Sequence, residues 1–158
     1  MPEFRRGVRL AVDWGKARVG VAACDVDGLL CYPVETVPAR DADQALARIA
    51  QLVAQNAAVE VVLGLPLALD GRVRVAAEDV LTIAARLAGC VDVPVRAVDE
   101  RLTTAAANRQ MTNLDTRRRR PIVDQAAAVG ILDSALAFER NTGRPPGHLV
   151  VALTEGES

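Results

Sequence analysis

The chain has 158 residues, a length typical of one domain with a hydrophobic core and too short for a second large domain. About half of the residues are hydrophobic (51%) and a quarter are charged (25%), which excludes both a disordered chain and a membrane protein. The net charge of −1 provides no global basic field, so any binding to nucleic acid must be local. The N-terminal MPEFRRG lacks the apolar stretch of a signal peptide, so we expect a cytoplasmic protein with no membrane partner.

The scarcity of two residue types restricts the chemistry. The only histidine is His148 and the only serines are Ser134 and Ser158, which leaves little material for a Ser-His-Asp hydrolase or a histidine base. Acids are abundant, with 12 Asp and 8 Glu, and there are 18 Arg beside the single Lys16. Carboxylates are therefore expected to carry any catalysis.

The three cysteines, Cys24, Cys31 and Cys90, have neither CxxC spacing nor the density of a disulfide framework. We therefore expect no zinc site and interpret all three as small buried apolar residues. 

Three apolar strands are predicted first, over residues 8–14, 18–24 and 29–37. The short turns between them, 15–17 and 25–28, indicate an antiparallel meander. A helix capped by Asp41 should follow, because four apolar residues recur at helical spacing after it. These residues are Leu46, Ile49, Leu52 and Val53.

The second half of the chain alternates strands and helices. We predict strands over Val59–Leu65 and Pro94–Glu100 and a helix from about Val73 to Ala88. A further helix should begin at Thr103 or Thr104, be interrupted by Arg117–Arg120, and be followed by a last helix from Ile122. Residues 148–153 are either a short strand or a loosely held end.

The order βββαβαβαα calls for an α/β fold, a mixed five-stranded sheet covered by helices, with the strands that begin at Val8, Val59 and Val95 parallel at its centre. Residues 1–150 should form this single domain and residues 151–158 a flexible tail.

Acidic residues follow the strand ends where ligands of open α/β sheets gather. Asp13 ends the first strand, Asp99 and Glu100 end the strand from residue 94, and Asp124 lies near the start of the last helix. Carboxylates brought together repel one another unless a cation lies between them, and oxygen ligands alone favour Mg²⁺ or Mn²⁺. Such ions activate water and stabilise charge on a phosphodiester.

Strand alternation selects between the two neighbouring acids. Asp99 and Glu100 point to opposite faces and should not both reach one metal, so Glu100 is chosen. The alternative for each acid alone is a helix cap or a solvated strand end, and Asp124 could be only an acid interacting with a helix dipole.

Four segments resemble the motifs of the YqgF/RuvX family, in the same order. They are VDWGKARVGVA (12–22), VVLGLPLALDGR (61–72), VDERLTTAAA (98–107) and RRRPIVDQAAAVGIL (118–132). The family consists of small RNase H-like bacterial proteins described as Holliday junction resolvases and as nucleases that mature the 5′ end of precursor 16S rRNA. The resemblance implies an RNase H-like fold and an acidic centre at Asp13, Glu100 and Asp124. The family's basic segment is usually rich in lysine where this chain has Arg117–Arg120, and a Gly-Pro pair after the DG is replaced by Val73–Val75.

Basic residues near these acids are candidates for binding the nucleic-acid backbone. Lys16 and Arg18 follow Asp13 in a tight turn that is otherwise an ordinary polar turn. Arg117, Arg118, Arg119 and Arg120 are either a solvated charge cluster or a clamp on phosphates. Arg101 and Arg109 would extend the clamp. With 3% aromatic residues, recognition should depend on shape and phosphates, which suits structured RNA and branched DNA alike.

Three functions are compatible with these features. The first is a metal-dependent nuclease for structured nucleic acid, acting in pre-16S rRNA processing, Holliday junction resolution or both, as a monomer or homodimer. The second is a non-catalytic RNA-binding module for ribosome assembly that uses only the arginines. The third is an actin-like ATP-binding phosphotransferase, which would need a second domain for which this chain is too short.

Overall fold

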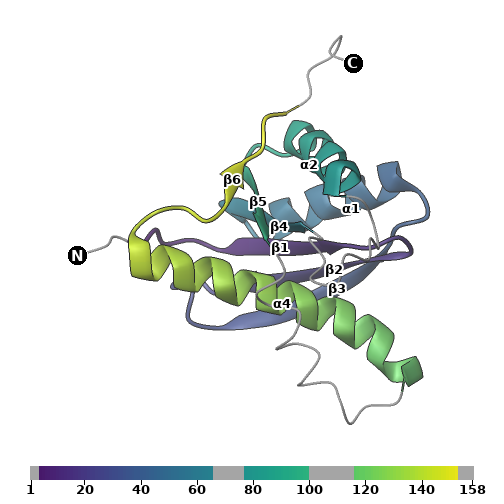
Figure 1. The fold of residues 1–158 in the computed structure, drawn as a ribbon, viewed down its shortest axis with the longest axis horizontal. Coiled ribbons are helices and arrows are strands. Elements are labelled where there is room, and N and C mark those ends of the chain that lie inside the picture. Colours follow the sequence, from purple (N-terminus) through teal and green to yellow (C-terminus); the bar gives the residue numbers. More distant parts are fainter. Residues whose placement is uncertain (1–3, 66–76, 100–115, 153–158) are drawn as a thin grey trace.

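The computed structural model describes residues 4–65, 77–99 and 116–152, with side chains of α2 from residue 79 and of α4 from residue 125. The described elements are β1 (Arg9–Trp14), β2 (Arg18–Cys24), β3 (Cys31–Pro38), α1 (Ala42–Gln55), β4 (Glu60–Leu65), α2 (Ala77–Cys90), β5 (Val95–Asp99), α4 (Thr116–Thr142) and β6 (His148–Leu149). The strands form one mixed sheet in the order β3-β2-β1-β4-β5-β6, with α1 and α2 on one face and α4 on the other (Figure 1).

The predicted strand directions are confirmed. β1, β2 and β3 form the antiparallel meander, and β4 and β5 add to β1 in parallel, so that β1, β4 and β5 lie side by side. The sheet has one strand more than the five expected, because residues 148–149 pair antiparallel with β5. The two-residue length of this edge strand explains why the sequence pattern did not establish it.

Helix α1 begins where the sequence predicts. The Asp41 carboxylate accepts hydrogen bonds from the backbone N–H groups of Asp43 and Gln44, so it satisfies two donors that a helix start leaves unpaired. The four predicted apolar residues of this helix are all buried, against the β-sheet face that α2 also covers.

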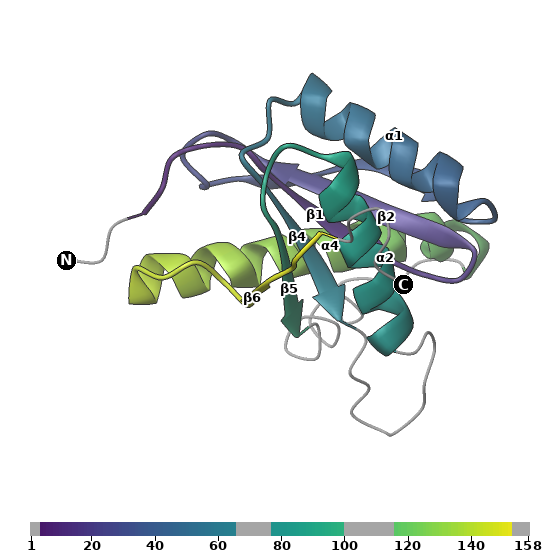
Figure 2. The same cartoon turned by 90° about the horizontal axis from the view of Figure 1, so that it is seen from above.

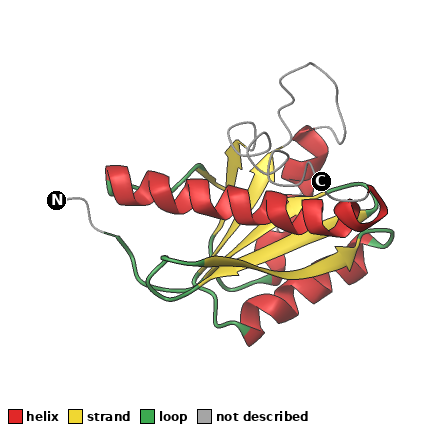
Figure 3. Cartoon of the chain, turned by 90° about the horizontal axis from the view of Figure 1, so that it is seen from below, coloured by secondary structure: helices red, strands yellow, loops and turns green. Residues whose placement is uncertain are grey.

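Helix α4 departs from the prediction at its beginning. The arginine run Arg117–Arg120 does not separate the last helix from what precedes it but lies within the first turns of α4, which begins at Thr116. The preceding helix, predicted from Thr103 or Thr104, lies outside the described residues. Arginine has a high helix propensity, and the charge run therefore extends the helix rather than breaking it. In the view of Figure 3, α4 runs across one face of the sheet.

Side chains alternate between two cores, one on each face of the sheet. On β1, Leu10 and Val12 belong to the larger core under α1 and α2, whereas Ala11 belongs to the smaller core under α4. Figure 2 shows the two helical layers on opposite sides of the sheet. Among the described residues, no helix is long and apolar enough to cross a membrane.

A network of buried charges closes the α4 face at the start of β1. The Arg9 guanidinium, which is 1% exposed, donates a 2.8 Å hydrogen bond to the Glu139 carboxylate of α4. Arg5 donates to both Glu139 and Glu60, at 3.0 Å from its backbone nitrogen and 3.1 Å from its side chain respectively. The guanidinium groups of Arg9 and Arg140 both lie over the Phe4 ring, 4.7 and 4.6 Å from its centroid.

The electrostatics of this network favour the charged forms. Burial alone would raise the pKa of Glu139, but hydrogen bonds from Arg5 and the charges of Arg9 and Arg5 hold it below its usual value. The pKa of Arg5 is raised because its bonds to the two carboxylates outweigh the effect of burial. The network therefore ties the N-terminal segment, β1, β4 and the end of α4 together.

The cysteines behave differently from one another. Cys24 is buried and Cys31 is half-buried, and burial raises the pKa of both thiols. Cys90 is exposed at the end of α2, so the expectation of three buried cysteines is wrong for that residue. Its place in the last turn of a helix at the surface explains its exposure.

Candidate functional site

Asp13 lies near the carboxyl end of the central strand β1 and is half-buried. Alternation along β1 places it on the same face as Ala11, the face that α4 covers. Its partner on β2 is Gly20, and on β4 Gly64 follows Leu63, the partner of Val12. The two flanking strands therefore contribute no side chain at the positions beside the Asp13 carboxylate.

The turn after Asp13 is tight for a local reason. The Gly15 N–H donates to the Arg18 carbonyl oxygen at 2.9 Å, and a Cβ at Gly15 would lie 2.7 Å from that oxygen. Glycine is thus required at this position. The turn exposes Lys16 and leaves Arg18 half-buried, so both predicted cations lie at the same end of the sheet as Asp13.

A third cation lies against this turn. The Ala39 N–H donates to the Ala17 carbonyl oxygen at 3.0 Å, which brings the end of β3 beside the turn. The next residue, Arg40, is exposed. Arg40 did not stand out in the sequence, because only the pairing of β3 with β2 brings position 40 beside the turn that contains Lys16.

The acid Asp99 of β5 does not lie on the face of the sheet that carries Asp13. Its register partner on β4 is Leu65, which packs with the core under α1 and α2, whereas the preceding Val98 packs with the core under α4. Asp99 therefore lies on the face opposite to Asp13, in agreement with the alternation argument for this pair of acids. Glu100, the predicted acid, lies outside the described residues.

A second candidate acid, Asp124, is part of helix α4. Asp124 lies about two turns after the helix start, and α4 has no acid in its first turn. The interpretation of Asp124 as an acid at the helix N-terminus is therefore wrong. Position 124 precedes the buried Ala128 and Ile131 by four and seven residues, a spacing typical of one helical face.

One hydrogen bond ties this part of α4 to the sheet. Gln125, next to Asp124, donates from Nε2 to the hydroxyl oxygen of Thr36 at 2.8 Å. Thr36 is the register partner of Gly20, so it lies in the same cross-strand row as Asp13. Neither Thr36 nor Gln125 stood out in the sequence, since neither has a charge and only the sheet register relates them to Asp13.

Part of the predicted site remains a prediction. Glu100, Arg101 and Arg109 lie outside the described residues, as do the side chains of Asp124 and of the arginine run 117–120. Within the described ranges, no three histidine, cysteine or acidic side chains form a group that could hold a metal ion.

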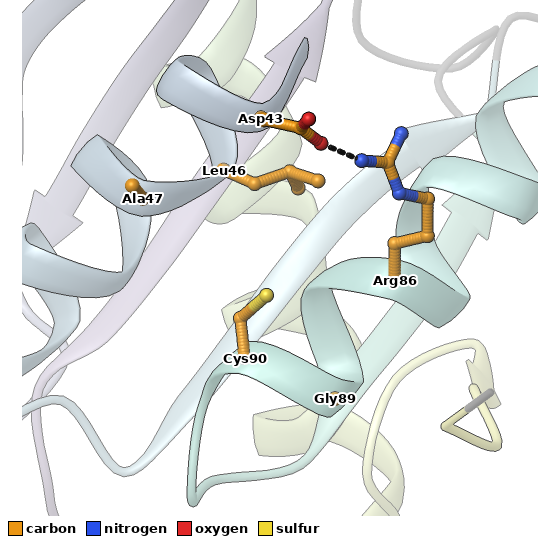
Figure 4. A pocket seen from close by; sticks show the side chains of 6 residues that line it. All are labelled: Asp43, Leu46, Ala47, Arg86, Gly89 and Cys90. Atoms are coloured by element: carbon orange, nitrogen blue, oxygen red, sulfur yellow. Dashed lines mark hydrogen bonds and ion pairs between the residues drawn. The ribbon is translucent and has the colours of Figure 1, made fainter. Parts of the chain in front are cut away.

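A groove of about 440 Å³ lies between α1 and α2 (Figure 4). Asp43 of α1 and Arg86 of α2 form an ion pair across it, and Leu46 and Cys90 are among the residues that line it. These helices cover the sheet face opposite to Asp13. The groove is therefore separate from the candidate acidic site.

The arrangement of the sheet and its helices is similar to that of known structures. The fold is similar to that of RuvC from Thermus thermophilus in complex with a Holliday junction substrate, with a TM-score of 0.60 and 17% identity over 89% of this chain and 99% of that one. A second Thermus thermophilus RuvC structure matches with a TM-score of 0.57. The chain thus has the RNase H-like α/β fold.

The chain belongs to the RuvX family, whose model, described as Holliday junction resolvase, matches residues 7–137. A relative from Streptomyces coelicolor, named "Putative pre-16S rRNA nuclease", is 52% identical over 92% of this chain and 89% of its own length. A relative of the same name from Clavibacter michiganensis is 47% identical over 93% of both chains. The family resemblance seen in the sequence is confirmed, and the protein is a nuclease, a hydrolase of phosphodiester bonds.

Proposed function

We propose that this nuclease cuts structured nucleic acid with the help of a divalent cation, and that its substrate is the 5′ end of precursor 16S rRNA. The observation that carries the proposal is the position of Asp13. This acid ends the central strand on the α4 face, beside two glycines, at the sheet edge where α/β proteins bind their ligands.

The acids of the proposed metal site are Asp13, Glu100 and Asp124. The chemistry of these donors fits Mg²⁺ or Mn²⁺, which prefer carboxylate oxygens over nitrogen or sulfur. The alternation along β5 supports Glu100, since Asp99 lies on the opposite face. The helical periodicity of α4 supports Asp124. A bound ion would activate water and stabilise the negative charge that develops on the phosphodiester.

The cations near Asp13 would hold the backbone of the substrate. Lys16 and Arg40 are exposed beside the β1–β2 turn, and Arg18 lies next to them. The predicted clamp of Arg117, Arg118, Arg119 and Arg120 would begin at the start of α4, and Arg101 would extend it. Phosphate contacts of this kind position a nucleic acid without reading its sequence.

Resolution of Holliday junctions is the second candidate activity, because the family model carries that description. A junction has two symmetric cleavage sites and would favour a homodimer, whereas trimming of an RNA end requires only a monomer. Cytoplasmic action, as expected from the sequence, fits either substrate.

Side-by-side cleavage of precursor 16S rRNA and a synthetic four-way DNA junction, with Mg²⁺, with Mn²⁺ and with EDTA, tests the proposal. We expect metal-dependent cleavage of the RNA and a loss of roughly a hundredfold or more in Asp13→Asn, since a metal ligand supplies several kcal/mol to the transition state. Cleavage of the junction but not of the RNA would make Holliday junction resolution the favoured activity, in place of precursor 16S rRNA processing. Full activity of Asp13→Asn, or activity in EDTA, would overturn the metal site.

A further inference from the structure

We propose that Thr36 and Gln125 are positioning residues that hold the Asp124-bearing turn of α4 over Asp13. The inference rests on the proposed function, because it assigns a task to Asp124 as a metal ligand. It extends that function with two neutral residues that would contact neither the metal nor the substrate.

The sheet register places Thr36 where such a contact is needed. Asp13, Gly20 and Thr36 are register partners on β1, β2 and β3, and they form one row across the sheet. The hydrogen bond with Gln125 shows that Thr36 faces α4, on the side of the sheet that Asp13 also faces. Since adjacent strands lie about 4.8 Å apart, Thr36 and Asp13 are separated by roughly 10 Å, and the intervening glycine has no side chain.

The residue before Thr36 on β3 confirms this orientation. Glu35, which precedes Thr36, accepts hydrogen bonds of 2.8 and 2.7 Å from Arg48 of α1. The two residues therefore point to opposite faces of the sheet, as alternation requires. Thr36 is thus directed to α4 by the same strand geometry that directs Glu35 to α1.

Among the side chains of α4 that the structure describes, from residue 125 onwards, those closest to Asp124 make only small apolar contacts. The buried ones are Ala127 and Ala128, whose small side chains remove little apolar area from water, and Ile131 and Leu132 follow one turn later. The far end is held by Glu139 and its two arginines. Among the described side chains, the Gln125–Thr36 bond is the polar contact of α4 with the sheet nearest to Asp124.

A shift of this turn would matter more for catalysis than for stability. A single hydrogen bond contributes little to the folding of a domain whose core lies elsewhere. Metal ligands, in contrast, must be held within about half an ångström of their working positions, and their supporting contacts set that precision. Loss of the bond should therefore weaken metal binding and turnover while leaving the fold and nucleic-acid binding in place.

Four variants test the proposal: Thr36→Val and Gln125→Met remove the bond with little change of volume, Thr36→Ser keeps the hydroxyl, and Thr142→Val is the matched control. Thr142 donates a side-chain hydrogen bond of 2.7 Å to the Phe138 carbonyl oxygen at the far end of the same helix. Mn²⁺ binding without nucleic acid, followed by electron paramagnetic resonance, gives the metal Kd. Cleavage assays give kcat, KM and the Mg²⁺ concentration at half-maximal rate.

We expect Thr36→Val and Gln125→Met each to raise the metal Kd and the Mg²⁺ midpoint by about threefold to tenfold, the range that one hydrogen bond accounts for. The value of kcat should fall and KM should stay within about twofold. The double variant should be no worse than the worse single variant, since both remove the same bond. Thr36→Ser and Thr142→Val should resemble the unmodified protein.

An unchanged metal Kd and kcat in both single variants, or additive losses in the double variant, would overturn the positioning role. If Thr36→Val does not fold, Gln125→Met decides alone, because its substitution lies on the helix and leaves β3 intact. Failure of the proposed function itself would look different, because Asp13→Asn would then bind Mn²⁺ and cleave RNA as the unmodified protein does.

Discussion

The two ends of β1 carry charges on the same face of the sheet, but these charges differ in their burial and in their surroundings. At the start of β1, which we call the closed end, Arg9 is buried and paired with Glu139, and the Arg5 guanidinium completes the network. At the other end, which we call the open end, Asp13 lies four residues along the same strand and is only half-buried, with glycines at the flanking positions. Charges at the closed end are paired within a buried network, whereas the acid at the open end is half-buried, at the end of the sheet where we propose that the substrate binds.

The cations divide in the same way. At the closed end, the structure pairs even the exposed Arg6 with Asp27 at 3.0 Å. At the open end, Lys16 and Arg40 form no ion pair with any side chain in the described part of the chain. Unpaired cations beside a strand-end carboxylate are what a phosphate-binding surface requires, because a structural partner would compete with the phosphate.

The largest effect should come from breaking the closed end. Glu139→Ala would leave Arg9 buried without its acid and deprive Arg5 of one of its two partners, and losing one partner of a buried ion pair costs about 3–5 kcal/mol. Urea unfolding followed by circular dichroism measures this loss. Asp27→Ala, which breaks the exposed pair with Arg6, is the control and should cost less than about 1 kcal/mol. Equal losses in the two variants would contradict the buried character of the network.

Low pH should reduce the stability that Glu139 contributes at the closed end. Although burial acts in the opposite sense, hydrogen bonds from Arg5 and the charges of Arg9 and Arg5 keep the pKa of Glu139 below the ordinary value that it has in the unfolded chain. The stability it contributes is therefore complete above that value and is lost as the pH falls through the lower, folded pKa. Unfolding free energies measured between pH 7 and pH 3 should fall less steeply in Glu139→Gln than in the unmodified protein. Parallel curves would show that Glu139 does not titrate differently in the two states.

Substitutions at the open end should change the salt dependence of RNA binding rather than the stability of the fold. Lys16→Ala and Arg40→Ala should each reduce the slope of log K against log salt for RNA binding by about one, the value for one phosphate contact. Arg6→Ala is the matched control, because its guanidinium is exposed but already paired with Asp27 at the closed end. A slope that also falls in Arg6→Ala would show that the response reflects total charge and not a local surface.

The sequence predicts the open end better than the closed one. Asp13, Lys16 and Arg18 are close in the chain, and a strand followed by a tight turn is enough to place them. Glu139 and Arg9, in contrast, are 130 residues apart, and only the path of α4 across the sheet brings them together. An acid in a helix next to an arginine reads as a surface residue, so the network gave no signal.

The row that joins Asp13 to Thr36 was missed for a similar reason. The meander was predicted from its short turns, but the register of β2 with β3 includes a shift between Val21 and Ala22. Such an irregularity changes which residues lie opposite each other and cannot be read from alternation alone. The choice of Glu100 over Asp99, in contrast, needed only the alternation of one strand, and the position of Asp99 on the other face agrees with it.

The smallest expected effect on stability is that of Asp13→Asn, and it is the one that separates the two ends most directly. Asparagine keeps the shape of the side chain and removes its charge at a half-buried position, so the unfolding free energy without metal should change by no more than about 0.5 kcal/mol. Mg²⁺ should then raise the unfolding midpoint of the unmodified protein and of Glu139→Gln, because a ligand that binds only the folded state stabilises it. In Asp13→Asn this increase should be lost. A loss of stability in Asp13→Asn as large as that in Glu139→Ala would make Asp13 a structural acid and remove the distinction between the two ends.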